Sequence, residues 1–444
     1  MNLNRHIAHL DLDTFFVSVE RLRNPKLLGK PLLIGGSSDR GVVAACSYEA
    51  RKFGIHSAMP MRAALRLCRE AIVVKSDFEE YSRFSSMVTE VISDTVPVFE
   101  KSSIDEFYID LSGMDRFHGC LKFADELKTK VLRESGLPVS YALASNKLVS
   151  KVATNEVKPN GGIEIAFGNE KSYLAPLSVM KIPGIGKETG YKFLKMGVET
   201  VKMLSEIPVL LLQNLLGKSG PELSRRANGI DESPVIPYHE QKSISTENTF
   251  QQDTIDIAFL DAELVRMTEK IAFELRNQNR LTGCITVKIR YSDFETHTIQ
   301  RRIPYNNSDL LLVKTVREIF LKLYERRMLI RLIGVRFTHL IAGTYQINMF
   351  NDSSEMINLY QAVDSIKNQF GEGLLSSAAA IQAKPAATGA DAAGRSKRSQ
   401  ADFSLKKATQ ASRSAFDFQK ATNFARLAAK KPGPAGQASA AGSD

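Results

Sequence analysis

The sequence predicts a multidomain α+β protein, and three observations support this. Strand and helix patterns are mixed irregularly over residues 7–171. Helix signals then flank a PGIG turn within residues 172–235, and the order β-α-β-β-α-β follows over residues 244–341. A chain of 444 residues is long enough for two to four domains, and an apolar fraction of 43% is ordinary for folded cores.

In the N-terminal region, we expect elements in an order typical of one α+β core domain. A strand that runs into a helix is predicted over 7–20, and two short strands joined by a Gly/Ser/Asp turn over 31–46. The remaining expectations are a turn and an amphipathic helix (48–68), a helix (78–95), a hairpin (98–112), a helix (123–135), a strand (139–145) and a helix (146–157).

Residues 172–341 carry two further patterns. The segment LSVMKIPGIGKETGYKFLKMG is typical of a helix–hairpin–helix, whose glycines let backbone N–H groups approach a phosphate. Residues 236–243 read as an exposed linker. We then expect strand (244–252), helix (256–278), strand (284–292), strand (296–303), helix (308–326) and strand (331–340), which would form a small four-stranded antiparallel sheet.

Charge and cysteine content restrict the class of protein. The net charge of +10 and pI near 9.2 favour an acidic partner such as nucleic acid. More than half of that charge comes from residues 371–444, where Lys and Arg outnumber Asp and Glu by six, so the rest of the chain is only mildly basic. The four cysteines form no CxxC pair, which argues against zinc and a disulfide framework. Without a secretory signal or membrane span, we expect a cytoplasmic protein.

Acidic residues from distant parts of the chain carry the strongest chemical signal. Asp11 and Asp13 lie two apart on the first predicted strand, where they would share a face, and Asp105 and Glu106 lie at the expected hairpin bend. Because such carboxylates repel one another, their convergence indicates a divalent cation. Mg²⁺ prefers oxygen ligands and binds substrate phosphates, so a two-metal phosphoryl-transfer site is expected. Residue spacing alone leaves open whether Asp11 or Asp13 joins the site.

Each of the other candidate residues has both a functional and a purely structural interpretation. Tyr48 and Arg51 lie three apart and could bind phosphate oxygens, or could be a packed tyrosine and a surface arginine. Lys158 precedes a Pro-Asn-Gly turn and could be aimed at a phosphate or exposed in a loop. Phe15 and Phe16 could both be core aromatics, or one ring could lie under an incoming sugar.

Together these motifs resemble the Y-family translesion DNA polymerases, most closely the bacterial DNA polymerase IV branch. The resemblance covers roughly residues 7–342 and rests on segments in the family's order and spacing: DLDTFFVSVE, SYEARKFGI, SSIDEFYID, ASNKLVSKVAT, KPNGG, IPGIGK and IRLIGVRF. It implies a right-hand polymerase: palm (1–17 and 78–171), fingers (18–77), helix–hairpin–helix thumb (172–235), linker (236–243), little finger (244–342), clamp-binding peptide (343–352) and a mostly disordered basic tail (353–444).

The resemblance also implies roles for single residues. Asp11, Asp105 and Glu106, with the backbone carbonyl of Leu12, become the ligands of two Mg²⁺ ions, and Asp13 becomes structural. Tyr48, Arg51 and Lys158 become triphosphate contacts, and Phe16 the steric gate that excludes a ribose 2′-hydroxyl. Many relatives have a hydroxyl residue where this chain has Ala45, a difference that removes one phosphate hydrogen bond worth about 1 kcal/mol.

The expected partners are primer–template DNA, dNTPs and a sliding clamp (β subunit). Basic residues on or beside the predicted strands suit tracking of a phosphate backbone, although some could be solvated sheet edges. The candidate DNA contacts are Gly184, Gly186, Lys187, Lys288, Arg290, Arg331 and Arg336, with Arg301 and Arg302 nearby. In QINMF, Gln346, Met349 and Phe350 resemble the bacterial clamp-binding motif. No membrane contact is expected, and the chain is expected to act as a monomer, associated with the nucleoid when engaged.

Three readings therefore compete. The first is a low-fidelity, template-directed DNA polymerase without proofreading. The second is a catalytically silent scaffold that binds DNA and the clamp, which the retained acids argue against. The third is a polymerase that needs an activating partner. The basic tail fits a nonspecific DNA tether and a variable linker equally well.

Overall fold

The computed structural model describes residues 5–36, 38, 40–114, 119–238, 240–343, 354–371 and 375–381. The chain divides into two compact units, Met1–Gln241 and Lys242–Asp444. Each unit combines sheets and helices, so the α+β multidomain class predicted from the sequence is confirmed. No helix in the described part of the chain is both long and apolar enough to cross a membrane.

The first unit is organised around a five-stranded sheet in the order β5-β6-β1-β7-β8. The central strand β1 is buried along its whole length and pairs antiparallel with β6 on one side and β7 on the other, whereas β8 runs parallel to β7. A strand in this central position holds its side chains rigidly. The strands are β1 (Ile7–Leu12), β5 (Phe99–Lys101), β6 (Glu106–Asp110), β7 (Val139–Ala144) and β8 (Gly162–Glu164).

Helices pack on this sheet through apolar faces. The main core joins side chains of the central strands with those of α1, α4 and α5, and a second core joins α6 with the helices that follow it. Helix α4 begins at Asp77, whose side chain accepts a hydrogen bond from the Glu80 N–H, and α6 is capped by Asn146 in the same way. The helices are α1 (Phe15–Arg23), α4 (Phe78–Ser93), α5 (Cys120–Ser135) and α6 (Lys147–Glu156).

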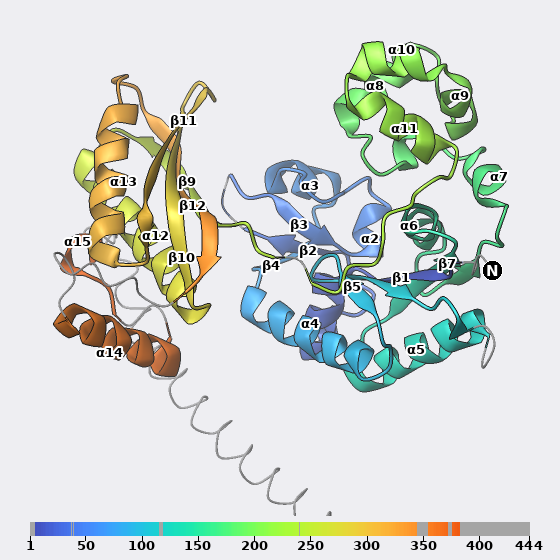
Figure 1. The fold of residues 1–444 in the computed structure, drawn as a ribbon, viewed down its shortest axis with the longest axis horizontal. Coiled ribbons are helices and arrows are strands. Elements are labelled where there is room, and N and C mark those ends of the chain that lie inside the picture. The colour runs from blue at the N-terminus through green and yellow to red at the C-terminus, as the bar shows by residue number, and fades with distance from the viewer. Residues whose placement is uncertain are drawn as a thin grey trace, which may run out of the picture. The chain divides into compact units, whose positions relative to one another are not determined.

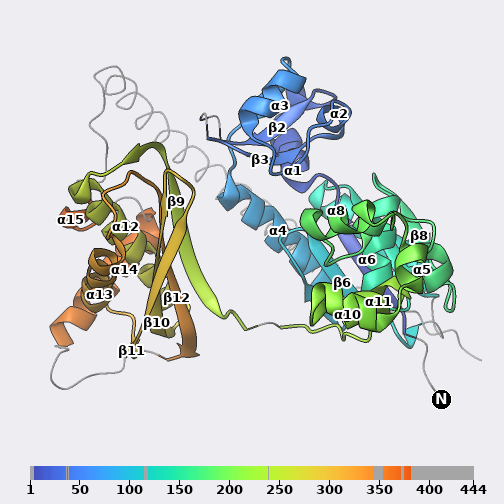
Figure 2. The same cartoon turned by 90° about the horizontal axis from the view of Figure 1, so that it is seen from above.

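A smaller subdomain interrupts the sequence between α1 and α4. Its three-stranded sheet has the order β3-β2-β4 and a separate apolar core that includes Leu33, Val43 and Met61. Figure 2 shows this sheet with α2 and α3 at one end of the first unit. The elements are the 3-10 turn η1 (Pro25–Leu27), β2 (Leu32–Gly35), β3 (Val43–Cys46), α2 (Tyr48–Arg51), α3 (Met61–Leu67) and β4 (Ile72–Val74).

The rest of the first unit is helical. The sequence predicted helices on both sides of PGIG, but the element before it is only a 3-10 turn, η3 (Val179–Lys181), which stops ahead of Pro183. Gly184 has a φ of 96°, which favours glycine, and α8 begins directly after Gly186. The helices are α7 (Glu170–Leu174), α8 (Lys187–Lys195), α9 (Val201–Glu206), α10 (Val209–Leu216) and α11 (Ser219–Ala227).

The second unit contains the predicted β-α-β-β-α-β order. Its four strands form an antiparallel sheet in the order β11-β10-β12-β9, and α12 and α13 pack on one face (Figures 1 and 2). Alternate residues Ile285, Val287 and Ile289 point into that core. The elements are β9 (Ser243–Thr254), α12 (Ile257–Asn277), β10 (Arg280–Tyr291), β11 (Thr296–Asn306), α13 (Asp309–Leu323) and β12 (Ile330–Ala342).

Two helices follow this sheet, α14 (Ser354–Phe370) and α15 (Ala378–Ile381). The expectation of a mostly disordered segment over 353–444 is therefore wrong for residues 354–370. The prediction failed because α14 contacts its neighbours through polar side chains such as Tyr360 and Asp364, so hydropathy gave no sign of a buried face. Residues 382–444 lie outside the described residues, as do residues 344–353 with Gln346, Met349 and Phe350.

Candidate active site

The strand register brings the predicted acids to one place. Asp11 on β1 lies directly opposite Glu106 on β6, and the N–H of Leu12 donates to the carbonyl oxygen of Asp105 at 3.0 Å. Asp105 lies in the bend between β5 and β6, while Glu106 is the first residue of β6. The hairpin expected from the sequence therefore exists, and it places both acids beside the end of β1.

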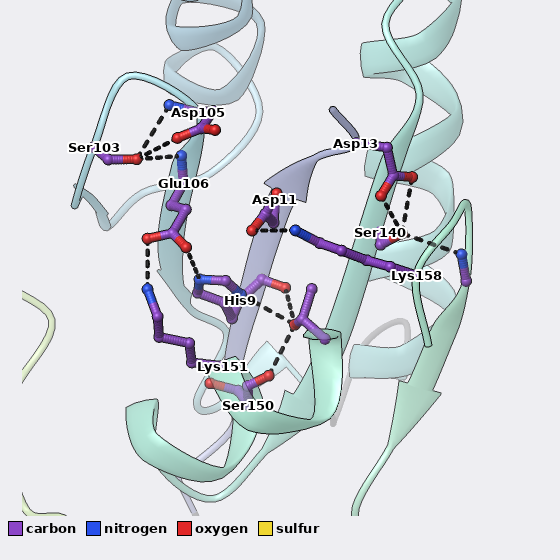
Figure 3. Close-up of polar contacts among 12 residues, drawn as sticks. His9, Asp11, Asp13, Ser103, Asp105, Glu106, Ser140, Ser150, Lys151 and Lys158 are labelled. Atoms are coloured by element: carbon purple, nitrogen blue, oxygen red, sulfur yellow. Dashed lines mark hydrogen bonds and ion pairs between the residues drawn. The ribbon is translucent and has the colours of Figure 1, made fainter. Parts of the chain in front are cut away.

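Each of two carboxylates has a lysine partner. The Lys158 ammonium lies 2.6 Å from Asp11 Oδ2, and the Lys151 ammonium lies 2.6 Å from Glu106 Oε2 (Figure 3). Asp105 has a different arrangement, because its Oδ1 accepts a hydrogen bond from Ser103 Oγ at 2.6 Å. The same hydroxyl oxygen accepts from the N–H groups of Asp105 and Glu106. Ser103 thus fixes the bend, and the two lysines offset part of the negative charge.

The environment of Asp11 disfavours its charged form. Burial is the largest cause and raises the pKa of Asp11 to about 7, against the opposing effect of Lys158. The neighbouring carboxylates Asp105 and Glu106 raise the pKa further. An approaching positive charge would stabilise the carboxylate form of Asp11, but below about pH 7 a cation would have to displace a proton from it.

The donor chemistry at this site suits a hard cation. Within the described ranges, no group of three or more His, Cys, Asp or Glu side chains is arranged to hold a metal ion, and lysines pair with two of the acids. The acids nevertheless offer oxygen donors, which Mg²⁺ prefers. His9 is fully buried, and burial followed by the charges of Lys151 and Lys158 lowers its pKa, so it adds no positive charge. The residues present therefore fit Mg²⁺.

Asp13 points away from the acidic set and supports neighbouring loops (Figure 3). It is buried and accepts hydrogen bonds from Ser140 Oγ at 3.0 and 2.9 Å, from the Asn160 N–H at 2.7 Å and from the Tyr48 hydroxyl at 3.2 Å. Of the two acids between which spacing did not choose, Asp11 lies beside Glu106 and Asp13 is bonded to Ser140 instead. Asp13 thus connects the turn after Lys158 to Tyr48 at the start of α2.

Tyr48 and Arg51 share the short helix α2. The guanidinium carbon of Arg51 lies 5.0 Å from the centroid of the Tyr48 ring, a cation–π contact. Burial and then the charge of Asp13 raise the pKa of the Tyr48 hydroxyl, so it remains a protonated donor at neutral pH. Arg51 is exposed and free to contact an anion. The helical face expected from the spacing is therefore present.

Phe16 is held by aromatic contacts. Its ring stacks on Tyr81 of α4 with centroids 4.3 Å apart and meets Phe78 edge-on at 5.7 Å. The Tyr81 hydroxyl donates to Glu20 Oε1 at 2.8 Å, which fixes that ring in turn. Phe15 is buried in the main core, whereas Phe16 is only partly buried. One of the two phenylalanines is thus a core residue and the other is available at the surface.

The predicted DNA contacts of the first unit lie at the start of α8. An added Cβ at Gly184 would come within 2.6 Å of the Arg226 guanidinium, which donates to the Pro183 carbonyl at 2.7 Å. Gly186 has open space around it, and Lys187 begins the helix. The N-terminus of an α-helix with unobstructed N–H groups can bind a phosphate.

In the second unit, several predicted contacts share the sheet face opposite the helices. Lys288 and Arg290 alternate with the buried residues of β10, and Arg336 lies across from Thr286 on β12. Arg331 stacks over Phe294 at 4.5 Å instead. Arg301 pairs with Glu318 of α13 at 2.6 Å, so its charge is already matched on the helical side. The alternation predicted from the sequence thus holds for Lys288, Arg290 and Arg336, which share one face of the sheet.

Sequence reasoning assigned no role to Lys151 or Ser103, although both contact the acids. Lys151 lies within the segment ASNKLVSKVAT, which resembles the family, and on helix α6 directly after β7. That position in a family-like segment could have identified Lys151 as a candidate site residue. Ser103 precedes Asp105 by two residues, a spacing at which a hydroxyl commonly bonds to nearby backbone N–H groups.

Comparison with known proteins supports one family. Residues 10–155 match the model of the impB/mucB/samB family, and residues 241–349 match the model of that family's C-terminal domain. DNA polymerase IV of Dehalococcoides mccartyi is 36% identical over 371 residues, 83% of this chain and 95% of that protein. DNA polymerase IV of Caulobacter vibrioides is 34% identical over 382 residues, 85% of this chain and 94% of that protein.

A solved structure supports the same family as the sequence comparisons. A Y-family DNA polymerase chimera superimposes with a TM-score of 0.68 at 25% identity, over 76% of this chain and all of the chimera. The fold, the position of the acids and the relatives together lead to one assignment. The chain belongs to the impB/mucB/samB family, that is, to the Y-family translesion DNA polymerases, in the DNA polymerase IV group.

Proposed function

We propose that this chain extends a primer 3′-hydroxyl with dNTPs on a DNA template by two-metal phosphoryl transfer at Asp11, Asp105 and Glu106. The observation that carries the proposal is the strand register, in which Asp11 of β1 lies opposite Glu106 of β6. The carbonyl oxygen of Asp105 accepts a hydrogen bond from the N–H of Leu12, the residue after Asp11. Two acids on adjacent strands, with a third in the bend that leads into one of them, provide a fixed geometry for an in-line displacement.

These acids, with the backbone carbonyl of Leu12, would hold two Mg²⁺ ions. Bound there, the ions would supply Lewis acidity to the attacking hydroxyl and to the leaving pyrophosphate. Lys158 and Lys151 balance the charge of Asp11 and Glu106 in their absence. Once Asp11 is neutralised by a cation, the Lys158 ammonium becomes available to an anionic triphosphate, as the family resemblance suggests.

The neighbouring residues would select and position the nucleotide. Tyr48 and Arg51 lie on one side of α2, and the exposed Arg51 guanidinium suits binding of phosphate oxygens. The Tyr48 hydroxyl, which donates to Asp13 in this structure, would turn its O–H to a phosphate oxygen when a nucleotide binds. Phe16 would lie beneath the sugar, where its ring clashes with a ribose 2′-hydroxyl. Its stack on Tyr81 prevents the ring from moving aside.

The remaining parts fit a small translesion polymerase. We assign the five-stranded sheet to the palm, the 18–77 subdomain to the fingers, residues 172–235 to the thumb, 236–243 to the linker and the second sheet to the little finger. Gly184, Gly186, Lys187, Lys288, Arg290, Arg331 and Arg336 would contact the DNA backbone. QINMF would bind the sliding clamp, and the chain would act as a monomer without proofreading.

A primer-extension assay tests this proposal. Wild-type protein should extend a labelled primer with dNTPs and Mg²⁺, and Asp105→Ala should abolish extension while DNA binding, measured by fluorescence anisotropy, is unchanged. If wild type binds DNA but extends nothing, the chain is a silent scaffold or needs an activating partner. Loss of DNA binding together with activity in Asp105→Ala would contradict the proposed role of Asp105.

A further inference from the structure

His9 lies beside the acidic site without being one of its acids. It stands two residues before Asp11 on β1, so the two side chains share a face of the sheet. The ring is fully buried, and Nε2 faces Glu106 Oε1 across 4.0 Å, whereas Lys151 contacts the other carboxylate oxygen (Figure 3). Among the residues that the structure describes, Nε2 has no hydrogen-bond partner. A buried polar atom of this kind is rare in native proteins and calls for an explanation.

The imidazole ring is held from two sides. Tyr108 of β6 lies opposite His9 across the sheet, and the centroids of the two rings are 4.8 Å apart. The buried Thr154 of α6 places its Oγ1 3.0 Å from Nδ1. Because packed side chains in a core keep one rotamer, the ring presents Nδ1 to Thr154 and Nε2 to Glu106.

The position of the ring proton decides what the Glu106 carboxylate meets. Burial, followed by the charges of Lys151 and Lys158, lowers the pKa of His9, so the ring is neutral and carries one N–H. If Nε2 carries the proton, the N–H dipole points at the carboxylate and stabilises it. If Nδ1 carries it, the Nε2 lone pair faces the carboxylate and repels it. In a buried site this difference is larger than in water, because the local dielectric constant is low.

The Thr154 hydroxyl is suited to select the form with the proton on Nε2. Its single O–H lies within reach of Nδ1 and of two backbone carbonyl oxygens, that of His9 at 3.1 Å and that of Ser150 at 2.8 Å. Both carbonyls belong to regular elements, the central strand β1 and helix α6, in which backbone N–H groups bond to them. Donation of the hydroxyl to the Nδ1 lone pair leaves the ring proton on Nε2.

We propose that His9 is a positioning residue that presents its Nε2–H to Glu106, and that Thr154 holds the ring in this tautomer. The inference rests on the proposed function, in which Glu106 is a metal ligand. A carboxylate that binds a metal is oriented by hydrogen bonds from neighbouring groups, and loss of such a partner costs roughly 10- to 100-fold in metal affinity. Hydrogen bonds of this kind are often long in a ligand-free enzyme and shorten in the complex, which accounts for the separation of 4.0 Å.

The tautomer can be measured by NMR in the metal-free full chain, so this test does not depend on activity. With isotope-labelled histidine, long-range proton–nitrogen spectra distinguish a protonated from an unprotonated ring nitrogen, and the spectrum of His9→Gln identifies which of the seven histidines is His9. We expect a protonated Nε2 in the wild type. Thr154→Val should change the tautomer ratio, whereas Thr154→Ser, which keeps the hydroxyl, should not. A wild-type ring protonated on Nδ1, or an unchanged ratio in Thr154→Val, would overturn the proposal.

The affinity for Mg²⁺ provides a second readout, measured by calorimetry on the full chain with a dideoxy-terminated primer–template and dNTP. A glutamine places its amide N–H near the position of histidine Nε2, whereas an asparagine places it near Nδ1. His9→Asn should therefore weaken Mg²⁺ binding roughly 10-fold or more, and His9→Gln should retain most of the affinity. His297→Asn is the matched control, because His297 lies 3.6 Å from Glu295 in the second unit, and it should bind as the wild type does.

The two His9 variants separate positioning from packing. Equal losses of affinity in His9→Gln and His9→Asn would mean that His9 only fills space, and unchanged affinity in both would mean that Glu106 does not need it. Either result would overturn the proposal. A wild-type complex that binds no Mg²⁺ would contradict the proposed function instead, and the tautomer measurement would still decide the role of His9.

Discussion

The protonation state of Asp11 predicts how Mg²⁺ binding depends on pH. Burial, with Asp105 and Glu106 nearby, raises the pKa of Asp11 to about 7, whereas an unfolded chain would have a value near 3.8. A metal ligand must be a carboxylate, so Mg²⁺ has to displace a proton below pH 7. With a pKa of about 7, the carboxylate fraction rises roughly tenfold between pH 6 and pH 8, and the apparent Mg²⁺ affinity should rise by a similar factor.

The same shift fixes the sign of the stability effect. Because the pKa is raised on folding, protonated Asp11 stabilises the metal-free protein fully below about pH 4, and this contribution is lost as pH rises toward 7. Mg²⁺ should therefore stabilise the fold more at pH 8 than at pH 6, since it binds the carboxylate form.

Calorimetric titration of Mg²⁺ into a complex with a dideoxy-terminated primer and dNTP would measure the affinity at pH 6, 7 and 8. Asp11→Asn is the matched control and should bind more weakly, with little change across this range. A wild-type affinity that stays flat or falls with increasing pH would refute the electrostatic reasoning.

Three further variants follow from the structure. Phe16→Ala should admit ribonucleotides, measured as the ratio of dNTP to rNTP incorporation, and an unchanged ratio would show that another residue is the gate. Asp364→Ala removes one of the two carboxylates that contact the buried Arg276 guanidinium, the other being Asp309 at 2.7 Å, and should destabilise the second unit by about 1.5–3 kcal/mol in hydrogen-exchange experiments. The partly exposed pair Asp261–Arg317 is the control, and Asp261→Ala should cost less than about 1 kcal/mol. Tyr48→Phe should raise the KM for dNTP severalfold while kcat changes little, and a loss of kcat alone would contradict a binding role.

The regular elements of this fold were predictable because their patterns are local. Apolar periodicity located β1, α4 and the whole of the second sheet with its two helices. Short strands such as β4 and β8 have three residues each and leave no periodic signal, so sequence reasoning missed them. Helix α14 was missed for a different reason, since ion pairs and amide contacts bury its polar side.

The candidate site was predictable only in part. Spacing identified the acids, yet it could not separate Asp11 from Asp13, because residues two apart on a strand share a face. The chain leaves β1 after Leu12, and this turn directs Asp13 toward Ser140 while Asp11 stays beside Glu106. Lys151 and Lys158 converge on the acids through tertiary packing, which no sequence spacing records.

Single-turnover primer extension with isosteric variants tests the central claim most directly. Asp11→Asn, Asp105→Asn and Glu106→Gln remove one negative charge each and keep the side-chain shape. Asp110→Asn, on the same strand as Glu106 but hydrogen-bonded to the Ser112 N–H, is the control. We predict that each of the first three lowers the rate by several orders of magnitude with primer–template binding intact, and that Asp110→Asn retains activity. Near-normal rates in any of the three, or equal losses in all four, would contradict the assignment of this site.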